Sequence, residues 1–170
     1  YKENDTKYDI INVYAPNDVK ERALFFKNII EIMPRSTSLI IMGDFNNTLA
    51  DIDRYGKTVH KYDHSYKALI DMMTEHNVVD VWRQRNEKKK VFSRKVVRGD
   101  MIVQSRIDFF LITRISCAFV RNIFYVETMS DHSMIEVLER GPGVWIHNNL
   151  LLYDEVYVNK VQERKEMYII

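Results

Sequence analysis

The run SLIIMG at Ser38–Gly43 restricts the possible folds of this chain more than any other segment, because it is short and, after its serine, continuously apolar. An unbroken apolar run of this length is typical of a strand that is covered on both faces. Such a strand needs layers of structure on both sides of its sheet. Because 46% of the residues are hydrophobic and 12% are aromatic, the chain has enough apolar material for a packed core and too much for a disordered chain.

The segments around this run predict strands and amphipathic helices. The run YDIINVY at Tyr8–Tyr14 is rich in residues that favour strands. Asp18 is a suitable N-cap, and apolar residues then recur every three or four positions, which predicts a helix over Asp18–Met33. A second helix is expected around Tyr66–Met73. With the later strands, these segments predict a mixed α/β or α+β domain. The later strands are expected at Phe92–Val97 and Arg106–Thr113, around a loop at Gly99–Asp100, and at Cys117–Val126 and Ser133–Leu138.

The composition excludes several classes of protein. Cys117 is the only cysteine, so the chain has no internal disulfide and lacks the paired cysteines of a zinc finger. No apolar run approaches the roughly 20 residues that a membrane-spanning helix requires, so no membrane partner is expected. The opening YKENDTKYD has no signal-peptide pattern, and we expect a protein that is not secreted. Since the first residue is Tyr1 rather than Met, we expect a piece of a longer chain.

Positive charge is concentrated in one part of a nearly neutral chain. The whole chain has 25 Lys and Arg residues against 24 Asp and Glu residues. The segment Arg83–Arg106 holds nine basic and two acidic residues, and its net charge is therefore +7. Such a segment is either an anion-binding face or a solvated hairpin.

Two polar residues follow the apolar run directly. Asp44 and Asn46 lie at the carboxyl end of the predicted strand, where ligands gather in open α/β sheets. In an extended chain their side chains point to the same side, and a carboxylate and an amide can together hold a water molecule and a hard cation. The alternative is an Asx turn that closes the strand.

Two further acids are chemical candidates. Asp131 and His132 are adjacent, and such a pair can supply a metal-binding oxygen and an imidazole for a phosphate or a proton. Asp108 lies in the apolar segment RIDFFLIT, and a buried carboxylate needs a partner. That partner is either a histidine, whose tautomer the carboxylate would fix, or an arginine such as Arg106.

These motifs occur in an order that resembles a known superfamily. INVYAPN is followed by IIMGDFNNTLADIDRYG, then by SRIDFFLIT and then by SDH. In this order they resemble the endonuclease/exonuclease/phosphatase superfamily of exonuclease-III-like and apurinic/apyrimidinic-endonuclease-like phosphodiesterases. They are most similar to the endonuclease domain of non-LTR (LINE-type) retrotransposon polyproteins. The stretch RGPGVWIHNNLLLYDEVYV also resembles the segment that leads from such an endonuclease towards the reverse transcriptase.

The resemblance implies a role for each matching residue. Asp44 would orient or deprotonate the attacking water, and Asn46 would help to place water and phosphate. His132 would stabilise the charge that develops on the scissile phosphate, and Asp108 would pair with this histidine. Asp131 would belong to the metal site together with Asp44. Tyr14 would lie at the phosphate, and Asn17 and Arg54 would meet the DNA. Beside this resemblance, the basic segment is expected to contact DNA phosphates, and its candidate residues are Lys88, Lys89, Lys90, Arg94, Lys95 and Arg98.

The resemblance also implies a fold, a cofactor and partners. The implied fold is α/β, a DNase-I-like sandwich of two β-sheets flanked by helices. The implied cofactor is Mg²⁺, with Mn²⁺ as a substitute. The implied partners are DNA and the reverse-transcriptase region of the parent polyprotein. The protein would be nuclear when it acts on DNA and otherwise cytoplasmic.

The chain departs from the family pattern at its start. It begins at the YAPN strand, whereas the family has an earlier half that carries a glutamate metal ligand. We therefore expect residues 1–140 to be the C-terminal part of the endonuclease domain and residues 141–170, from Gly141 onward, to begin a linker with a helix from about Leu150. Such a fragment is expected to be inactive, or nearly so, alone. The alternatives are a non-catalytic, DNA-binding remnant of a degenerate retroelement and a repair nuclease of the apurinic/apyrimidinic type.

Overall fold

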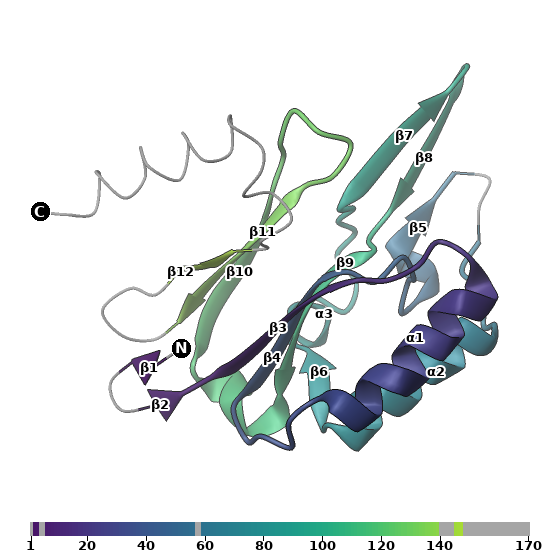
Figure 1. The fold of residues 1–170 in the computed structure, drawn as a ribbon. Helices are drawn as coiled ribbons and strands as arrows, with labels where there is room; N and C mark the ends of the chain where they lie inside the picture. The colour runs from purple at the N-terminus through teal and green to yellow at the C-terminus, as the bar shows by residue number, and fades with distance from the viewer. Residues whose placement is uncertain (1, 4–5, 57–58, 140–144, 148–170) are drawn as a thin grey trace, which may run out of the picture.

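The structure is a computed structural model, and it describes the chain except for residues 1, 4–5, 57–58, 140–144 and 148–170. Figure 1 shows two helices on one side of a central sheet and a second sheet on the other side. The predicted domain boundary at Gly141 and the predicted helix from Leu150 lie outside the described residues. Within the described part, no helix is both long enough and apolar enough to span a membrane.

The central sheet has four strands in the order β3-β4-β9-β6. Strand β4 runs parallel to β3 and antiparallel to β9, and β9 is also antiparallel to β6. Every residue of β4 and β9 is buried, which confirms that the apolar run forms a strand covered on both faces. The four strands are β3 (Asp9–Tyr14), β4 (Leu39–Asp44), β9 (Asp108–Thr113) and β6 (Val78–Asp80).

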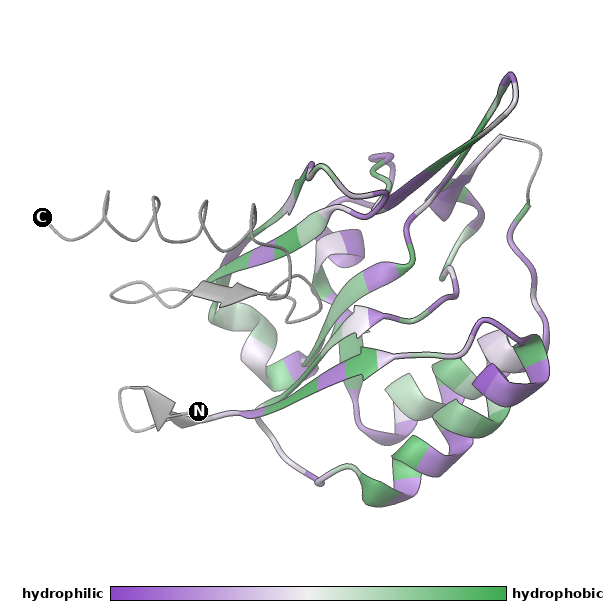
Figure 2. Ribbon diagram, turned by 45° about the horizontal axis from the view of Figure 1, so that its top comes forward, coloured by the Kyte–Doolittle hydropathy of each residue, from purple (hydrophilic) through white to green (hydrophobic). Residues whose placement is uncertain are grey.

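Helices α1 (Val19–Ile32) and α2 (His64–Glu75) cover one face of this sheet (Figure 1). Both helices mix hydrophobic and hydrophilic residues, as Figure 2 shows, and their apolar residues form one core cluster with side chains of β4 and β9. Asp18 caps α1 by accepting the backbone N–H groups of Lys20 and Glu21, at 2.8 and 3.1 Å. The predicted N-cap and helix are therefore confirmed.

A second sheet covers the other face of the central sheet. It has the order β10-β11-β12, and all of its strands are antiparallel. The alternate residues of β4 and β9, among them Ile40 and Phe110, pack against Ile123 and Val137 of this sheet in a second core cluster. This arrangement confirms the predicted sandwich of two sheets flanked by helices. The strands are β10 (Val120–Val126), β11 (Met134–Glu139) and β12 (Trp145–His147).

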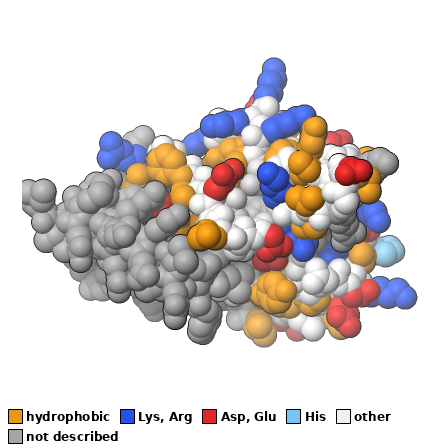
Figure 3. All heavy atoms as spheres, turned by 90° about the horizontal axis from the view of Figure 1, so that it is seen from above, with side chains coloured by type: hydrophobic (Ala, Val, Ile, Leu, Met, Phe, Trp, Pro, Cys, Tyr) orange, Lys and Arg blue, Asp and Glu red, His pale blue; other side chains and the backbone are white. Residues whose placement is uncertain are grey.

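A third sheet, of order β5-β8-β7, projects from the sandwich as a hairpin (Figure 1). Its hairpin joins β7 to β8 through Gly99, whose φ of +58° lies in the left-handed region that glycine adopts without steric cost. Figure 3 shows Lys and Arg side chains among apolar ones on the face of the molecule seen from above. The strands are β5 (Arg54–Tyr55), β7 (Arg94–Arg98) and β8 (Met101–Ser105), and a separate pair is formed by β1 (Lys2–Glu3) and β2 (Thr6–Lys7).

Three sequence predictions about strands were wrong in detail. The strand that pairs with β7 across the Gly99 turn is β8, whereas Arg106–Thr113 contributes β9 to the central sheet. Residues Arg114–Ala118 form a 3₁₀ helix, so the strand expected from Cys117 begins at Val120. Strand β12 follows the strand predicted to be the last. The remaining elements are α3 (Val81–Arg85) and a 3₁₀ turn at Asp51–Asp53.

Candidate functional site

Three candidate residues lie in one row at the end of the central sheet. Tyr14 is the last residue of β3 and pairs in register with Asp44, the last residue of β4. Asp44 in turn pairs with Asp108, the first residue of the antiparallel strand β9. Tyr14 is 61% exposed, whereas both carboxylates are buried. The parallel and antiparallel pairings therefore bring together three side chains that are far apart in the sequence.

His132 approaches this row from the loop before β11. Its Nδ1 atom lies 3.0 Å from Oδ2 of Asp108, and the Asp108 side chain is only 2% exposed. This hydrogen bond to Asp108 raises the pKa of His132, although partial burial opposes the shift. Of the two partners that the sequence left open for Asp108, the structure therefore selects the histidine. The guanidinium of Arg106 instead pairs with the carboxylates of Asp53 and Asp80.

Asp44 forms the Asx turn that was the alternative interpretation of this motif, and it is also part of the row. Its Oδ1 atom accepts the backbone N–H of Asn46 at 2.7 Å. Burial, and next the negative charge of Asp108, raise the pKa of Asp44 to about 6. Asn46 has a φ of +47°, so the extended backbone assumed from the sequence is wrong at this residue. The amide of Asn46 instead donates to the carbonyl of Ala15 at 2.7 Å and ties the ends of β3 and β4 together.

Asp44, Asp108 and His132 form a group that could hold a metal ion. Each offers one ligand atom, and these atoms lie within 4.8 Å of one another. Two carboxylates suit a hard divalent cation, which would also offset the negative charge of Asp108 that, after burial, raises the pKa of Asp44. Asp131 is not in this group, because its exposed carboxylate lies 3.3 Å from Nε of Arg94. The role expected for Asp131 in a metal site stays a prediction.

A cleft of about 560 Å³ begins beside Asn46. Its walls come from the start of α1, the loop after β4 and the hairpin β7–β8. Nε of Arg54 donates to Oγ1 of Thr48 at 3.2 Å, which fixes this side chain in the wall. Three of the residues expected to contact DNA thus line one cleft together with Asn46: Asn17, Arg54 and Arg94.

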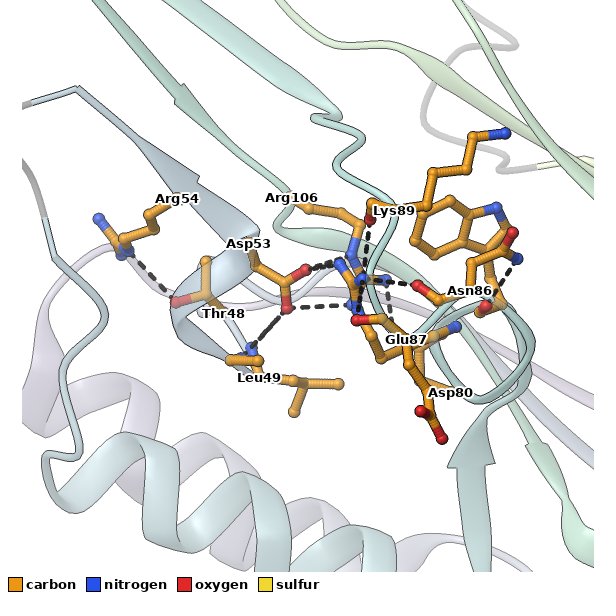
Figure 4. Close-up of polar contacts among 12 residues, drawn as sticks. Thr48, Leu49, Asp53, Arg54, Asp80, Asn86, Glu87, Lys89 and Arg106 are labelled. Carbon is orange, nitrogen blue, oxygen red and sulfur yellow. Dashed lines mark hydrogen bonds and ion pairs between the residues drawn. The ribbon is translucent and has the colours of Figure 1, made fainter.

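The basic segment Arg83–Arg106 is not one continuous face. Arg106 is completely buried, and its guanidinium bonds Asp53 through Nε at 2.7 Å and through Nη2 at 3.1 Å (Figure 4). Its Nη1 atom lies 2.6 Å from a carboxylate oxygen of Asp80, and Arg83 also pairs with Asp53. Burial acts to raise the pKa of Asp53, but the two arginines lower it overall. Arg83 and Arg106 are therefore structural cations.

The lysines of this segment are presented by an ordered turn. One nitrogen of Arg83, Nη1, donates to the carbonyl oxygens of Asn86 and Lys89, both at 2.9 Å, and the same side chain pairs with Asp53 (Figure 4). The three lysines at residues 88–90 are exposed, as is Lys95 in β7. Arg98 ends β7, and its side chain lies outside the part of the chain that the structure describes. The expected DNA contacts of these residues stay predictions.

Two residues that hold the site together carried no local signal in the sequence. Asp53 lies within the motif ADIDRYG, but nothing in the spacing shows that it meets Arg106, which is 53 residues away. Ser93 is a single buried serine before β7, and its hydroxyl accepts the backbone N–H groups of Ile107 and Asp108. Burial of these two residues is a tertiary property, so periodicity could not have identified them.

Comparison with known proteins identifies the family. The family model described as endonuclease-reverse transcriptase matches residues 8–136. The "Transposon TX1 uncharacterized 149 kDa protein" of Xenopus laevis is 31% identical over 172 residues. That alignment covers 95% of this chain and 13% of the Xenopus protein, so the chain spans a small part of this relative.

Solved structures share the fold. A 3′-5′ exonuclease of Neisseria meningitidis has a TM-score of 0.63 at 21% identity over 78% of this chain and 61% of its own. An AP endonuclease of Archaeoglobus fulgidus has a TM-score of 0.65 at 17% identity, over 79% and 62% of the two chains. The endonuclease domain of TRAS1, a telomere-specific non-LTR retrotransposon, has a TM-score of 0.59 at 17% identity, over 82% and 61%. Since the family model covers most of the chain, this protein belongs to the endonuclease-reverse transcriptase family.

Proposed function

We propose that this protein is part of a metal-dependent DNA endonuclease of a non-LTR retrotransposon. It would hydrolyse one phosphodiester bond in one strand and expose a 3′-hydroxyl for reverse transcription. The observation that carries the proposal is the row of Tyr14, Asp44 and Asp108 at one end of the sheet, with His132 bonded to Asp108. The retrotransposon context is supported by the match to the Xenopus transposon protein.

Each residue of the row suits one part of phosphodiester hydrolysis. Without a bound cation the pKa of Asp44 is about 6, so its carboxylate is ionised at neutral pH and can accept a hydrogen bond or a proton from the attacking water. The bond to Asp108 holds a proton on Nδ1 of His132 and favours the imidazolium, whose other nitrogen can donate to a phosphate oxygen. The exposed phenol of Tyr14 can donate to the same phosphate. These groups would stabilise the negative charge of the transition state.

A divalent cation fits the carboxylates of this site. Mg²⁺, or Mn²⁺ in its place, would be held by Asp44 with Asp108 or Asp131, and would neutralise charge on the phosphate and on the leaving 3′ oxygen. The fit rests on the donor set of two carboxylates, whose ligand atoms lie within 4.8 Å of each other and of a ring nitrogen of His132. The chain's own residues still have to orient the water and the phosphate.

DNA would lie along the cleft and the hairpin. The cleft presents Arg54 and Arg94 beside Asn17, and the turn before β7 presents three exposed lysines at residues 88–90. Contacts of this kind bind phosphates and set the affinity and its salt dependence, rather than the choice of sequence. We further propose that residues 141–170 lead towards a reverse-transcriptase region, as the size of the Xenopus relative suggests.

The direct test is nicking of supercoiled plasmid DNA in Mg²⁺ by the longest reading frame that contains this chain. Asp44→Asn and His132→Asn should each lower the rate about 10²–10⁴-fold. Asp71→Asn and His64→Asn change exposed residues of α2 and are the matched controls, which should keep the wild-type rate. Cleavage that needs no divalent cation, or that survives Asp44→Asn, would contradict the proposal. Cleavage restricted to abasic DNA would instead favour a repair nuclease.

A further inference from the structure

Ser93 lies at the root of the projecting hairpin and is only 1% exposed. It precedes β7 directly, and its backbone N–H donates to the carbonyl of Ser105, the last residue of β8, at 3.0 Å. Ser93 therefore closes the hairpin at the point where the hairpin joins the sandwich. This hydrogen bond uses backbone atoms only, so any residue except proline at position 93 could form it and it does not require a hydroxyl group.

The hydroxyl of Ser93 holds the start of strand β9. Its Oγ atom accepts the backbone N–H of Ile107 at 2.9 Å and that of Asp108 at 3.0 Å. Both residues are buried, and a buried N–H without a partner is costly. Without this oxygen, the peptide that carries Asp108 would have to shift or admit water.

The backbone of the same segment holds the loop that carries His132. The carbonyl of Ser93 accepts the backbone N–H of Ser133 at 2.6 Å, and the N–H of Lys95 donates to the carbonyl of Asp131 at 2.9 Å. His132 is thus flanked on both sides by hydrogen bonds to the root of the hairpin. Ser93 is the residue that binds the peptide of Asp108 with its side chain and the peptide after His132 with its main chain.

We propose that Ser93 is a positioning residue that sets the contact between Asp108 and His132. The proposal rests on the proposed nuclease function, in which His132 acts on the phosphate and Asp108 orients its ring. Ser93 does not itself meet the substrate. It fixes the two peptides relative to each other, so that Oδ2 of Asp108 and Nδ1 of His132 meet at 3.0 Å. A displacement of about 1 Å between such groups can lower a rate by about 100-fold.

The matched comparison is between two buried serines near opposite ends of β9. Ser93→Ala removes the hydroxyl at the Asp108 end. Ser116→Ala removes a buried hydroxyl that bonds Thr113, the last residue of β9, at 3.0 Å and the carbonyl of Thr37 at 3.2 Å. Each variant loses two hydrogen bonds, but in Ser116→Ala the hydroxyl of Thr113 keeps its bond to the carbonyl of Thr37 at 2.7 Å. Ser93→Ala leaves two buried N–H groups unpaired, so it should lose more stability in thermal unfolding. Ser93→Thr restores a hydroxyl at the same position.

The first measurement is the ring tautomer of His132, read from its ¹⁵N shifts by NMR on the full chain at a pH where the ring is neutral. It needs no nuclease activity. Wild type, Ser116→Ala and Ser93→Thr should keep the proton on Nδ1, because Asp108 accepts it. Ser93→Ala should move a large fraction of the proton to Nε2, the tautomer that a free ring prefers. An unchanged tautomer in Ser93→Ala would overturn the proposal.

The second measurement is the rate of plasmid nicking by the longest reading frame that contains this chain, with each substitution made in that protein. Ser93→Ala should lower kcat about 10- to 100-fold and change KM less than about twofold, and Ser93→Thr should recover most of kcat. An equal loss of kcat in Ser116→Ala would reduce Ser93 to a structural role and overturn the proposal. If wild type does not nick DNA at all, the proposed function fails, and the tautomer measurement still decides whether Ser93 sets the contact.

Discussion

Nδ1 of His132 and Oδ2 of Asp108 lie 3.0 Å apart, although 24 residues separate them in the chain. One comes from the loop between β10 and β11 of the second sheet, and the other is the first residue of β9 in the central sheet. The contact therefore joins the two layers of the sandwich at the end where Tyr14 and Asp44 also lie. The predictions below test this site and the buried contacts that support it.

Asp108→Asn should lower the nicking rate about 10²–10⁴-fold. An amide cannot hold the proton on Nδ1 of His132 as a carboxylate does. Because the amide is neutral, the negative charge that favours the imidazolium is also lost. Single-turnover nicking of plasmid DNA by the longest reading frame that contains this chain measures the effect. A rate within about threefold of wild type would show that the Asp108–His132 contact does not serve the reaction; the control is Asp71→Asn on α2.

Asp53→Asn should destabilise the protein by about 3–5 kcal/mol. The substitution leaves the buried guanidinium of Arg106 with weaker partners and removes the charge that also pairs with Arg83. Urea unfolding measures the change. Glu75→Gln removes a carboxylate that pairs with Arg35 at the surface, and it should cost less than about 1 kcal/mol. Equal effects of the two variants would contradict a special role for the buried network.

The same residue predicts how stability depends on pH. The pKa of Asp53 is below its ordinary value in the folded protein, so the unfolded chain takes up the proton first as the pH falls. The contribution of Asp53 is therefore complete above about pH 5 and is lost as the pH falls towards the folded pKa. Unfolding free energies measured across this range should fall less steeply for Asp53→Asn than for wild type. If the unfolding free energies of wild type and Asp53→Asn fell in parallel with pH, Asp53 would not be the cause of the pH dependence.

Replacing the three lysines at residues 88–90 with alanine should weaken DNA binding for all sequences alike. The loss of each lysine that contacts a phosphate should make the slope of log K against log salt less steep by about 0.9. Fluorescence anisotropy with duplex DNA at several salt concentrations measures this slope. The matched control replaces Lys20, Lys27 and Lys67 of α1 and α2, which are exposed and lie on the helical layer. Equal slopes for the two triple variants would show that the lysines at residues 88–90 do not contact the DNA.

The 170 residues alone are expected to nick plasmid DNA at background level. The chain covers 61% of the length of the TRAS1 endonuclease domain that it matches, and the remaining groups of such a domain would complete the metal site. The measurement compares this chain with the longest reading frame that contains it, at equal concentration in Mg²⁺. Nicking by the 170 residues that Asp44→Ala abolishes would disprove this expectation.

Much of the fold could be predicted because local patterns carry it. The unbroken apolar run at Ser38–Gly43 indicated a strand buried on both faces, and β4 is buried at every residue. The capping residue and the spacing after Asp18 predicted α1 nearly to its ends. The second strand of the hairpin, β8, was harder to predict, because it is half-exposed and its residues show no strong hydrophobic pattern. Its assignment depends on pairing with β7 across the Gly99 turn.

Local sequence patterns were enough to show which polar residues lie at the ends of the strands, since Tyr14, Asp44 and Asp108 each adjoin an apolar run. The partners of these residues depend on the tertiary structure. Arg106, two residues before Asp108, bonds Asp53 instead, and Asp131 faces Arg94 rather than Asp44. Strand and helix patterns act over a few residues, whereas the partner of a buried charge depends on which distant segments pack against it. That packing is also what gave Ser93 its place between Asp108 and His132.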